Sequence, residues 1–504
     1  RQSTVGGNAL AKVSVNGTHL EAQMGALLSS VILPHHALEM PCAGYGRCGK
    51  CRVVAHGALS ALSDAEREHL SPQDISRGVR LACCARVEGD CTVTLEGAAA
   101  SQIRLAGEMP DFVHDPIFSV CGVDIGTTTL ASCLYGPDGT LLAQASAPNP
   151  QAGWGADVIS RIEAALHGSG DALAASVRAG VRALVLEMAA SAHISAEAVD
   201  ALVITGNTAM LYLLTQTGPD CLSHAPFAAS RLFGETLAAG ELGLPCPHAQ
   251  VYLPRCMSAF VGADITTALL ASGICSKPDT RMLVDIGTNG EIALWHRGQL
   301  SCCSTAAGPA FEGAGLSMGM AGKTGAVDHV RVQDGALQAH VIGGGAPKGI
   351  CGSGVIDSLA CLLELEQLDE TGLLEQDPAP VAPPVCLTQK DVRMVQLAKS
   401  AICAGLRTLL RVEGLCGADA AELAVAGGFG SYLDVNSAGR IGLLPEELVP
   451  RVRVLGNAAL SGAAMLLLNR GFIPHSEALA AGARTVDLST SAEFMNAYTE
   501  GMFF

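Results

Sequence analysis

The sequence predicts an α/β protein built from several domains. Its 504 residues exceed what one hydrophobic core normally serves, so three or four domain-sized units are expected. Hydrophobic residues make up 49% of the chain and charged residues only 16%, which is typical of a globular and not of a disordered chain. Two local patterns indicate what these domains contain: a group of cysteines near the N-terminus, and a strand–turn–strand pattern that occurs twice.

The charge and hydropathy of the chain exclude several classes of partner. Nucleic acids and anionic membranes bind clustered Lys and Arg, whereas this chain has a net charge of −17 and no basic run. No apolar stretch reaches the roughly 18–20 residues that cross a bilayer, and no export signal opens the sequence. We therefore expect a cytoplasmic protein with no nucleic-acid and no membrane partner.

The cysteine group near the N-terminus predicts an iron–sulfur site. Cys42, Cys48 and Cys51 follow the spacing C-x5-C-x2-C, and Cys83 comes 32 positions after Cys51. Plant-type [2Fe-2S] domains use the closely related spacing C-x4-C-x2-C…C, because a two-iron cluster needs four converging thiolates. Glycines in the short loop permit the tight curl, since they adopt positive φ. They are Gly44, Gly46 and Gly49.

Two alternatives stay open for these cysteines. Four cysteines can also hold structural zinc, although zinc sites usually present paired C-x2-C knuckles and only one is found here. Cys84 is adjacent to Cys83 and competes with it as the fourth ligand. The run Arg80-Leu81-Ala82-Cys83 matches the ferredoxin pattern and favours Cys83.

The segments around the cysteines read as a small β-rich domain. Residues 12–15 and the residues after the Asn16-Gly17 turn are expected to be strands, as are 52–54 and 92–95. Ser63 and Glu66 form a capping box that opens a short helix through residue 70. Together with the cysteines, this pattern resembles the β-grasp [2Fe-2S] ferredoxin fold.

The repeated pattern is an apolar strand that runs into Asp-Ile-Gly-Thr, followed by a second strand and a turn. It places Asp124 and Asp285 161 positions apart in equivalent settings. A Gly-Thr turn exposes backbone N–H groups and hydroxyls to a phosphate chain, and two facing carboxylates can hold a hydrated Mg²⁺. We expect the turn residues to cradle phosphates. They are Gly126, Thr127, Thr128, Gly287, Thr288 and Asn289.

A third glycine-rich element completes the set. An apolar strand over residues 423–426 runs into Gly427, Gly428 and Gly430, where the absence of side chains lets the backbone approach adenosine. Helices rich in small residues are expected over 262–272 and 456–467, where they can cross closely. In contrast, residues 377–385 contain four prolines and are expected to form an exposed loop.

The three elements together resemble the superfamily of acetate and sugar kinases, Hsp70 and actin, over roughly residues 120–468. That resemblance implies a duplicated, ribonuclease H-like ATPase that binds ATP and Mg²⁺. We expect four segments: a ferredoxin-like domain over 1–96, a linker over 97–119, and two actin-like subdomains over 120–276 and 277–504. Glu291 and Glu312 are candidates for the base that orients water.

The pairing of a [2Fe-2S] domain with this ATPase resembles the reductive activators of corrinoid proteins, the family of RACo and the O-demethylase activating enzymes. Further motifs carry the resemblance, among them Gly206-Asn207-Thr208 and Ile350-Cys351-Gly352-Ser353. It implies that the chain uses ATP to pass one electron from its cluster to a Co(II) corrinoid protein, which restores Co(I). It also implies an upstream donor such as a ferredoxin or flavodoxin, and a homodimer.

Three other functions compete with this one. A small-molecule kinase fused to a ferredoxin would transfer phosphate to a metabolite. A redox sensor would change its nucleotide affinity with cluster state and deliver no electron. Activators of 2-hydroxyacyl-CoA dehydratases also join this ATPase fold to a cluster, but that cluster is [4Fe-4S] and bridges two subunits.

Overall fold

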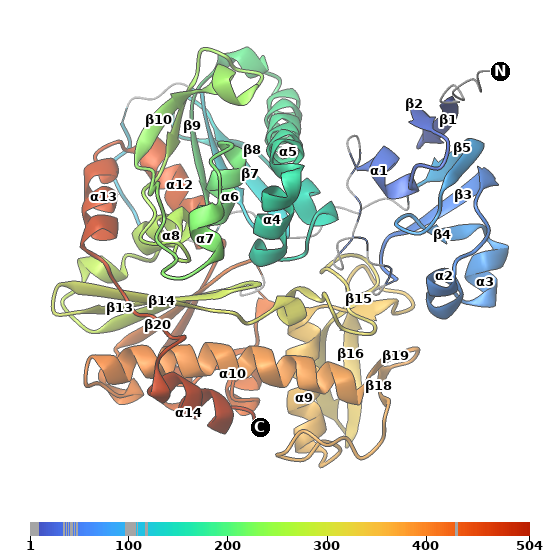
Figure 1. The fold of residues 1–504 in the computed structure, drawn as a ribbon. Helices are drawn as coiled ribbons and strands as arrows, with labels where there is room; N and C mark the ends of the chain where they lie inside the picture. The colour runs from blue at the N-terminus through green and yellow to red at the C-terminus, as the bar shows by residue number, and fades with distance from the viewer. Residues whose placement is uncertain are drawn as a thin grey trace. The chain divides into compact units, whose positions relative to one another are not determined.

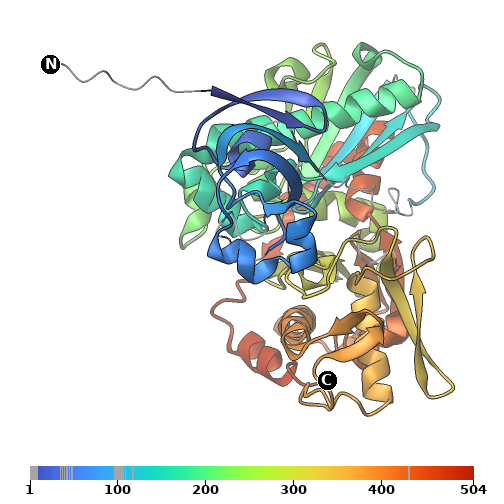
Figure 2. The ribbon, with the colours of Figure 1, turned by 90° about the vertical axis from the view of Figure 1, so that its right-hand side faces the viewer.

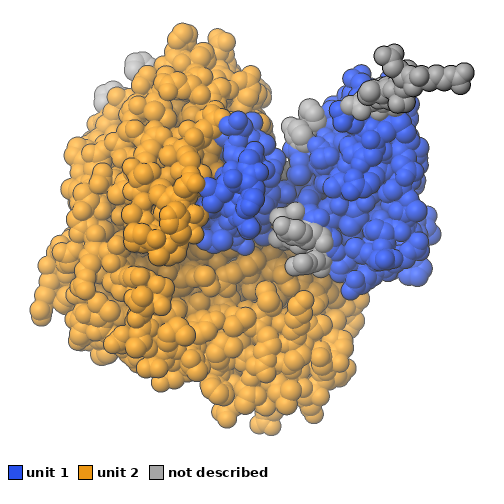
Figure 3. Space-filling model, viewed as in Figure 1, with its two compact units in different colours: residues 1–98, 148–177 blue, residues 99–147, 178–504 orange. Residues whose placement is uncertain are grey.

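The structure is a computed structural model that describes residues 10–33, 36, 38, 40, 44, 46, 49–95, 107, 109–115, 119–428 and 432–504. Cys42, Cys48 and Gly430 therefore lie outside the described residues. The chain divides into two compact units, coloured separately in Figure 3. Unit 1 comprises residues 1–98 and 148–177, and unit 2 comprises 99–147 and 178–504. Among the described residues, no helix combines the length and the apolar character that a membrane crossing requires.

Unit 1 contains a five-stranded sheet with the order β2-β1-β5-β3-β4, and its short helices α2 and α3 lie at one end of it (Figure 1). β1 pairs parallel with β5, whereas β1–β2, β3–β5 and β3–β4 are antiparallel. The elements are β1 (Leu10–Val15), β2 (Thr18–Gln23), α1 (Leu28–Ile32), β3 (Arg52–Leu59), α2 (Asp64–His69), α3 (Pro72–Ser76), β4 (Val79–Leu81) and β5 (Val87–Thr94).

Local sequence signals explain several of these elements. Asn16 and Gly17 both have positive φ, 48° and 86°, as a two-residue hairpin turn requires, and β1 and β2 pair on either side of them. The predicted capping box opens α2: the Ser63 hydroxyl accepts from the N–H of Glu66, and the Glu66 carboxylate accepts from the N–H of Ser63. The predicted hairpin and the predicted helix are both confirmed.

Residues 148–177 complete unit 1. They form η1 (Pro150–Gly153), α4 (Val158–Ala164), the turn η2 (Ala165–Ser169) and the start of α5 (Gly170–Ser191). A Cβ built on Gly153 would lie 2.2 Å from a methyl carbon of Leu33, just beyond α1. The segment thus packs directly on the N-terminal domain at this position.

Unit 2 is built on two six-stranded sheets (Figures 1 and 2), whose topologies match over five strands, β11-β9-β6-β7-β8 and β21-β20-β12-β13-β14. In each, the first strand of an antiparallel hairpin pairs in parallel with a later strand, β9 in the first sheet and β20 in the second. The first sheet has the order β10-β11-β9-β6-β7-β8 and the second β21-β20-β12-β13-β14-β22. This shared topology confirms an α/β fold with an internal duplication, which the repeated motif predicted.

The strands of the first sheet are β6 (Ser119–Ile125), β7 (Thr129–Tyr135), β8 (Leu141–Pro148), β9 (Val199–Gly206), β10 (Glu235–Ala238) and β11 (Gln250–Leu253). Those of the second are β12 (Arg281–Ile286), β13 (Gly290–His296), β14 (Gln299–Thr305), β20 (Glu422–Ala426), β21 (Val452–Gly456) and β22 (Arg484–Thr485). The helices of unit 2 after α5 are α6 (Thr208–Leu214), α7 (Asp220–Ser223), α8 (Ala263–Ser272), α9 (Gly352–Glu364), α10 (Gln389–Val412), α11 (Val435–Arg440), α12 (Ala458–Leu468), α13 (Phe472–Gly482) and α14 (Ala492–Glu500).

Two of these helices, α8 and α12, pack between the sheets in one continuous apolar core. A Cβ built on Gly462 of α12 would lie 1.8 Å from the carbonyl oxygen of Thr267 in α8, so the helix backbones are in direct contact. The prediction that small residues let these helices cross closely is confirmed.

One sequence prediction is wrong. Residues 377–385 do not form an exposed loop, because β18 (Ala379–Ala382) pairs with β19 (Val385–Leu387) in a two-stranded sheet. Ala379, Val381 and Val385 are buried in a second hydrophobic core of unit 2, separate from the core that contains α8 and α12. Prolines are tolerated in edge strands, and this small sheet has only edges. A three-stranded sheet of β16 (Ala336–Val341), β15 (Ala326–Gln333) and β17 (Gly349–Ile350) lies beside α9.

Candidate functional site

The two Asp-Ile-Gly-Thr turns of unit 2 open onto one cleft. The first turn joins β6 to β7 and the second joins β12 to β13. Of the residues predicted from the sequence, twelve line this cleft: Asp124, Gly126, Thr127, Thr128, Asp285, Gly287, Thr288, Asn289, Glu291, Glu312, Gly427 and Gly428. The fold thus brings together side chains from both repeats and from the glycine-rich turn after β20.

Asp124 and Asp285 occupy equivalent positions near the ends of β6 and β12. Oδ2 of Asp124 accepts a hydrogen bond from the Asn457 side-chain amide at 3.0 Å. Burial raises the pKa of Asp124 to about 6. Burial, and then the charges of Asp124 and Glu312, raise the pKa of Asp285 to about 7. The two carboxylates are therefore close enough to repel each other in a poorly solvated place.

Asp264, in the first turn of α8, is a cleft residue that the sequence reasoning missed. Burial, followed by the charges of Asp285 and Asp124, raises its pKa to about 8. Glu291 lies nearby on β13, and burial together with the charges of Asp264 and Asp285 raises its pKa well above the usual value. The run Gly-Ala-Asp that begins the small-residue helix carries the signal, since it places a carboxylate in the first turn of α8.

The turn backbones leave no room for side chains at some of the predicted positions. The N–H of Gly126 donates to the carbonyl of Thr129, and a Cβ there would lie 2.7 Å from that oxygen. The N–H of Gly287 donates to the carbonyl of Asn289 at 3.0 Å. Asn207, at the start of α6, donates to the Thr127 hydroxyl at 3.5 Å, which makes it a further cleft residue that the sequence motif alone did not assign.

The glycine-rich turn after β20 also requires glycine. Gly427 has φ of 104°, and a Cβ there would lie 2.6 Å from the carbonyl oxygen of Ile286 and 2.9 Å from a carboxylate oxygen of Asp285. This turn therefore lies directly against the second Asp-Ile-Gly-Thr turn. Ser353 at the start of α9 and Tyr432 line the same cleft.

The donor set of the cleft suits a hydrated divalent cation. Five carboxylates line it: Asp124, Asp264, Asp285, Glu291 and Glu312. Within the described part of the chain, no three His, Cys, Asp or Glu side chains are grouped to ligate a metal directly. Mg²⁺ prefers oxygen ligands and keeps several waters, so carboxylates that reach it through water fit this arrangement. A bound cation would also offset the mutual repulsion of these carboxylates, which contributes to their raised pKa values.

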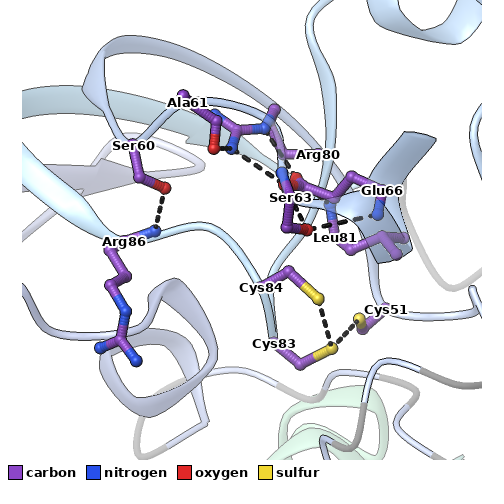
Figure 4. A network of polar contacts seen from close by, with 10 residues as sticks. All are labelled: Cys51, Ser60, Ala61, Ser63, Glu66, Arg80, Leu81, Cys83, Cys84 and Arg86. Atoms are coloured by element: carbon purple, nitrogen blue, oxygen red, sulfur yellow. Dashed lines mark hydrogen bonds and ion pairs between the residues drawn. The ribbon is translucent and has the colours of Figure 1, made fainter.

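A second candidate site lies in unit 1, where two buried thiols face each other (Figure 4). Sγ of Cys51, just before β3, lies 3.3 Å from Sγ of Cys83, which follows β4. Both cysteines are buried. Sγ of Cys84 is 3.6 Å from Sγ of Cys83, and burial raises the pKa of the Cys84 thiol to about 11. The remaining two predicted ligands, Cys42 and Cys48, lie outside the described residues.

The surroundings of this thiol pair agree with a tightly curled loop. Gly44, Gly46 and Gly49 all have positive φ, at 86°, 71° and 62°, as the sequence predicted. A Cβ on Gly44 would lie 3.8 Å from Cβ of Cys83, and one on Gly46 would lie 3.3 Å from Sγ of Cys84. Two buried thiols a few ångströms apart, with a glycine-rich loop beside them, are a fitting half of a four-thiolate cluster site.

A buried ion pair holds the strand that leads to Cys83. The Glu66 carboxylate accepts from Nε of Arg80 at 2.7 Å and from the N–H of Leu81 at 3.1 Å (Figure 4). Burial raises the pKa of Glu66, but the bonds from Arg80, Ser63 and Leu81 outweigh it and hold that pKa below the usual value. The backbone two residues before Cys83 is thereby tied to α2.

Comparisons with known proteins identify the family of the chain. The sequence matches the family described as "C-terminal domain of RACo the ASKHA domain" over residues 279–504, and "RACo middle region" over residues 120–277. It is 34% identical over 449 residues to the "Corrinoid activation enzyme RamQ" of Eubacterium limosum, which covers 81% of this chain and 75% of the relative. It is 29% identical over 266 residues to the "[Co(II) methylated amine-specific corrinoid protein] reductase" of Methanosarcina barkeri, which covers 48% of each.

A solved structure shares the whole fold. The "Reductive activator for corrinoid,iron-sulfur protein" superposes with a TM-score of 0.72 over 98% of both chains, at 24% sequence identity. At that identity the likeness shows the fold, while the identity and coverage of the Eubacterium limosum relative show the family. The chain therefore belongs to the RACo family of corrinoid activation enzymes.

Proposed function

We propose that this chain is an ATP-dependent reductive activator. It transfers one electron from a [2Fe-2S] cluster to the Co(II) corrinoid of a partner protein and thereby regenerates Co(I). One observation supports this most: a single chain has a buried pair of cysteines with their sulfurs 3.3 Å apart in unit 1 and two facing Asp-Ile-Gly-Thr turns in unit 2. The names of the two curated relatives point to the same kind of partner, a corrinoid protein.

In unit 1, Cys42, Cys48, Cys51 and Cys83 hold the cluster, which supplies the electron. Burial of Cys51 and Cys83 keeps water away from the sulfurs, and solvent exposure is one of the factors that set the potential of such clusters. Cys84, whose Sγ lies 3.6 Å from Sγ of Cys83, stays outside this set of ligands. The predicted extent of this domain is residues 1–96, with a linker over 97–119.

In unit 2, Asp124 and Asp285 hold Mg²⁺ through water, and the Gly-Thr turns bind the phosphates of ATP. Gly427, Gly428 and Gly430 line the adenosine. Glu291 and Glu312 are the candidates that orient the attacking water, since both line the cleft with the two aspartates. This ATPase occupies two subdomains, over residues 120–276 and 277–504.

The need for ATP follows from the potentials. Plant-type clusters lie near −400 mV, and the family resemblance implies a lower Co(II)/Co(I) couple. Moving one electron uphill by about 100 mV costs roughly 2.3 kcal/mol. A change between two conformations driven by ATP can supply this amount. An upstream ferredoxin or flavodoxin reloads the cluster, and the activator works as a cytoplasmic homodimer.

The test combines the anaerobically reduced protein with Co(II) corrinoid proteins, with and without Mg-ATP, while the cobalt spectrum is followed. We expect Co(I) only when ATP is present. The signal should vanish in Asp124→Ala and in Cys51→Ala, and it should persist in Asp138→Asn and Cys416→Ser, which alter exposed side chains that do not line the cleft.

Other outcomes would favour other functions. Phosphate transfer to an added metabolite, with no Co(I) from any corrinoid partner, would indicate the fused kinase. A nucleotide affinity that changes on cluster reduction, again without Co(I), would indicate the redox sensor.

A further inference from the structure

One carboxylate oxygen in unit 2 joins the two Asp-Ile-Gly-Thr turns. Oε2 of Glu312 accepts a hydrogen bond from the Thr288 hydroxyl at 2.8 Å and another from the Thr128 hydroxyl. Thr128 lies between β6 and β7, and Thr288 lies between β12 and β13. Glu312 itself ends the short helical turn η6 (Pro309–Glu312) after β14. The contact therefore links the two halves of the duplicated fold across the cleft.

This contact uses the same donors that a phosphate would use. A hydroxyl has one proton to donate. While Thr128 and Thr288 donate to Glu312, neither can donate to a phosphate oxygen. Carboxylate and phosphate oxygens are both anionic acceptors, and they repel each other at short range. Glu312 and a phosphate group must therefore compete for these two hydroxyls.

The surrounding charge strengthens the competition. Glu312 lies close enough to Asp285 that its charge, after burial and Asp124, contributes to the raised pKa of Asp285. Oε1 of Glu312 also lies 3.6 Å from the position that a Cβ on Gly287 would take, so the carboxylate occupies the space beside the second turn. The negative charge of Glu312 therefore repels an incoming phosphate group at the point where the two turns converge.

The backbone around Glu312 is connected both to the second turn and to the segment that follows η6. Gly308 and Gly313 flank η6 with φ of 79° and 75°, conformations that other residues rarely adopt. The N–H of Gly308 donates to the carbonyl of Thr288 at 2.8 Å, which ties η6 to the second turn. A Cβ on Gly313 would lie 2.4 Å from the carbonyl oxygen of Met320, so movement of η6 must pass to the next segment. That segment continues into residues 321 and 322, which line the cleft.

We propose that Glu312 senses the terminal phosphate of a nucleoside triphosphate. Without that phosphate, the carboxylate holds both threonine hydroxyls and keeps the two turns joined. A terminal phosphate oxygen replaces it there, and the Glu312 side chain turns away, which changes the contacts of residues 313–322. A nucleoside diphosphate leaves the contacts of Glu312 in place. The inference rests on the proposed nucleotide site and gives Glu312 a positioning role that precedes any part in orienting water.

The test measures the equilibrium affinity of the full chain for two nucleotides, Mg-AMPPNP and Mg-ADP, by calorimetry. The proteins are the wild type, Glu312→Gln, Glu312→Ala and the control Glu364→Gln. The control removes the negative charge of Glu364 at the end of α9. This residue forms an exposed ion pair with Arg440 of α11, outside the cleft. In both Glu312 variants we expect the AMPPNP-to-ADP affinity ratio to rise about tenfold, because the competing charge-assisted bonds are gone. The control should keep the wild-type ratio.

A second measurement uses the wild type alone and does not depend on how the variants fold. Hydrogen exchange of residues 308–322 should differ between the AMPPNP and ADP complexes. An unchanged or lowered affinity ratio in both variants, or equal exchange in the two complexes, would overturn the sensor. A wild type that binds neither nucleotide would instead overturn the nucleotide half of the proposed function.

Discussion

Glu66 is a fully buried carboxylate whose removal should strongly destabilise the N-terminal domain. It accepts two hydrogen bonds from Arg80, one from the N–H of Leu81, and two from the N–H and hydroxyl of Ser63. In Glu66→Ala the Arg80 side chain, which is only 11% exposed, loses its carboxylate. Removing one partner of a buried pair costs about 3–5 kcal/mol, because the remaining charge stays buried.

Asp74 supplies a matched control in the same domain. It too is the third residue of a capped helix, and it accepts from the N–H of Ser71 and pairs with Arg52 at 3.3 Å. Here the Arg52 side chain is 47% exposed, so water replaces the lost partner. Asp74→Ala should therefore cost about 1 kcal/mol.

The assay is hydrogen exchange measured by mass spectrometry on the full chain, read at the amides of β3 and β5. Their opening free energy should fall by about 3–5 kcal/mol in Glu66→Ala and by about 1 kcal/mol in Asp74→Ala. The Glu66→Ala protein should also bind less iron, because the strand that leads to Cys83 loses its tie to α2.

The effect of Glu66 should depend on pH with a defined sign. Its pKa in the folded state lies below the unfolded value of about 4.3. The stabilisation is therefore complete above that value and is lost as the pH falls through the folded pKa. Equal losses in the two variants, or a difference between Glu66→Ala and wild type that grows as the pH falls below about 4.3, would refute the reasoning.

Three further outcomes are expected. Cys83→Ser should lose the [2Fe-2S] absorption and Cys84→Ser should keep it; the reverse would make Cys84 the fourth ligand. Gly462→Ala should lower the unfolding free energy of unit 2, measured by urea titration, by about 1–3 kcal/mol, because its Cβ would meet the carbonyl oxygen of an α8 residue at 1.8 Å. Gly482→Ala in α13 should be nearly neutral, because its Cβ would have no atom within 4 Å. Burial lowers the pKa of Lys399 to about 8, while the unfolded value is about 10.4. The unfolding free energy of the wild type should therefore rise between about pH 8 and pH 10.4. Urea titrations of Lys399→Met should not show this rise.

Several features were predictable from the sequence because their causes are local. A two-residue turn with positive φ at Asn16 and Gly17 needs only those residues and their neighbouring strands. The capping box at Ser63 and Glu66 spans a single helical turn. The glycines of the cysteine loop adopt positive φ, as the chemistry of a tight curl demands. The duplicated motif likewise predicted the duplicated sheet topology, since an equivalent strand–turn–strand pattern forms an equivalent hairpin.

Features that depend on contacts between distant segments were missed. Asp264 is an ordinary helix residue by sequence, and it becomes part of the cleft only because α8 is held against the Asn207 turn and α12. The hairpin of β18 and β19 was expected to be a loop, because its prolines are visible in the sequence while the core that buries Val381 and Val385 is not.

The sequence by itself determined the chemistry available to this protein: four cysteines at cluster spacing, two aspartates before Gly-Thr turns, and a glycine-rich turn. Residue type and short spacing suffice for these, because they depend on local geometry and on what each side chain can bind. Only the tertiary structure decided that Glu312, 184 positions from Thr128 and 24 from Thr288, joins both turns through one oxygen atom. Such a contact depends on how two sheets pack, and packing is set by the whole core and not by any short stretch of the chain.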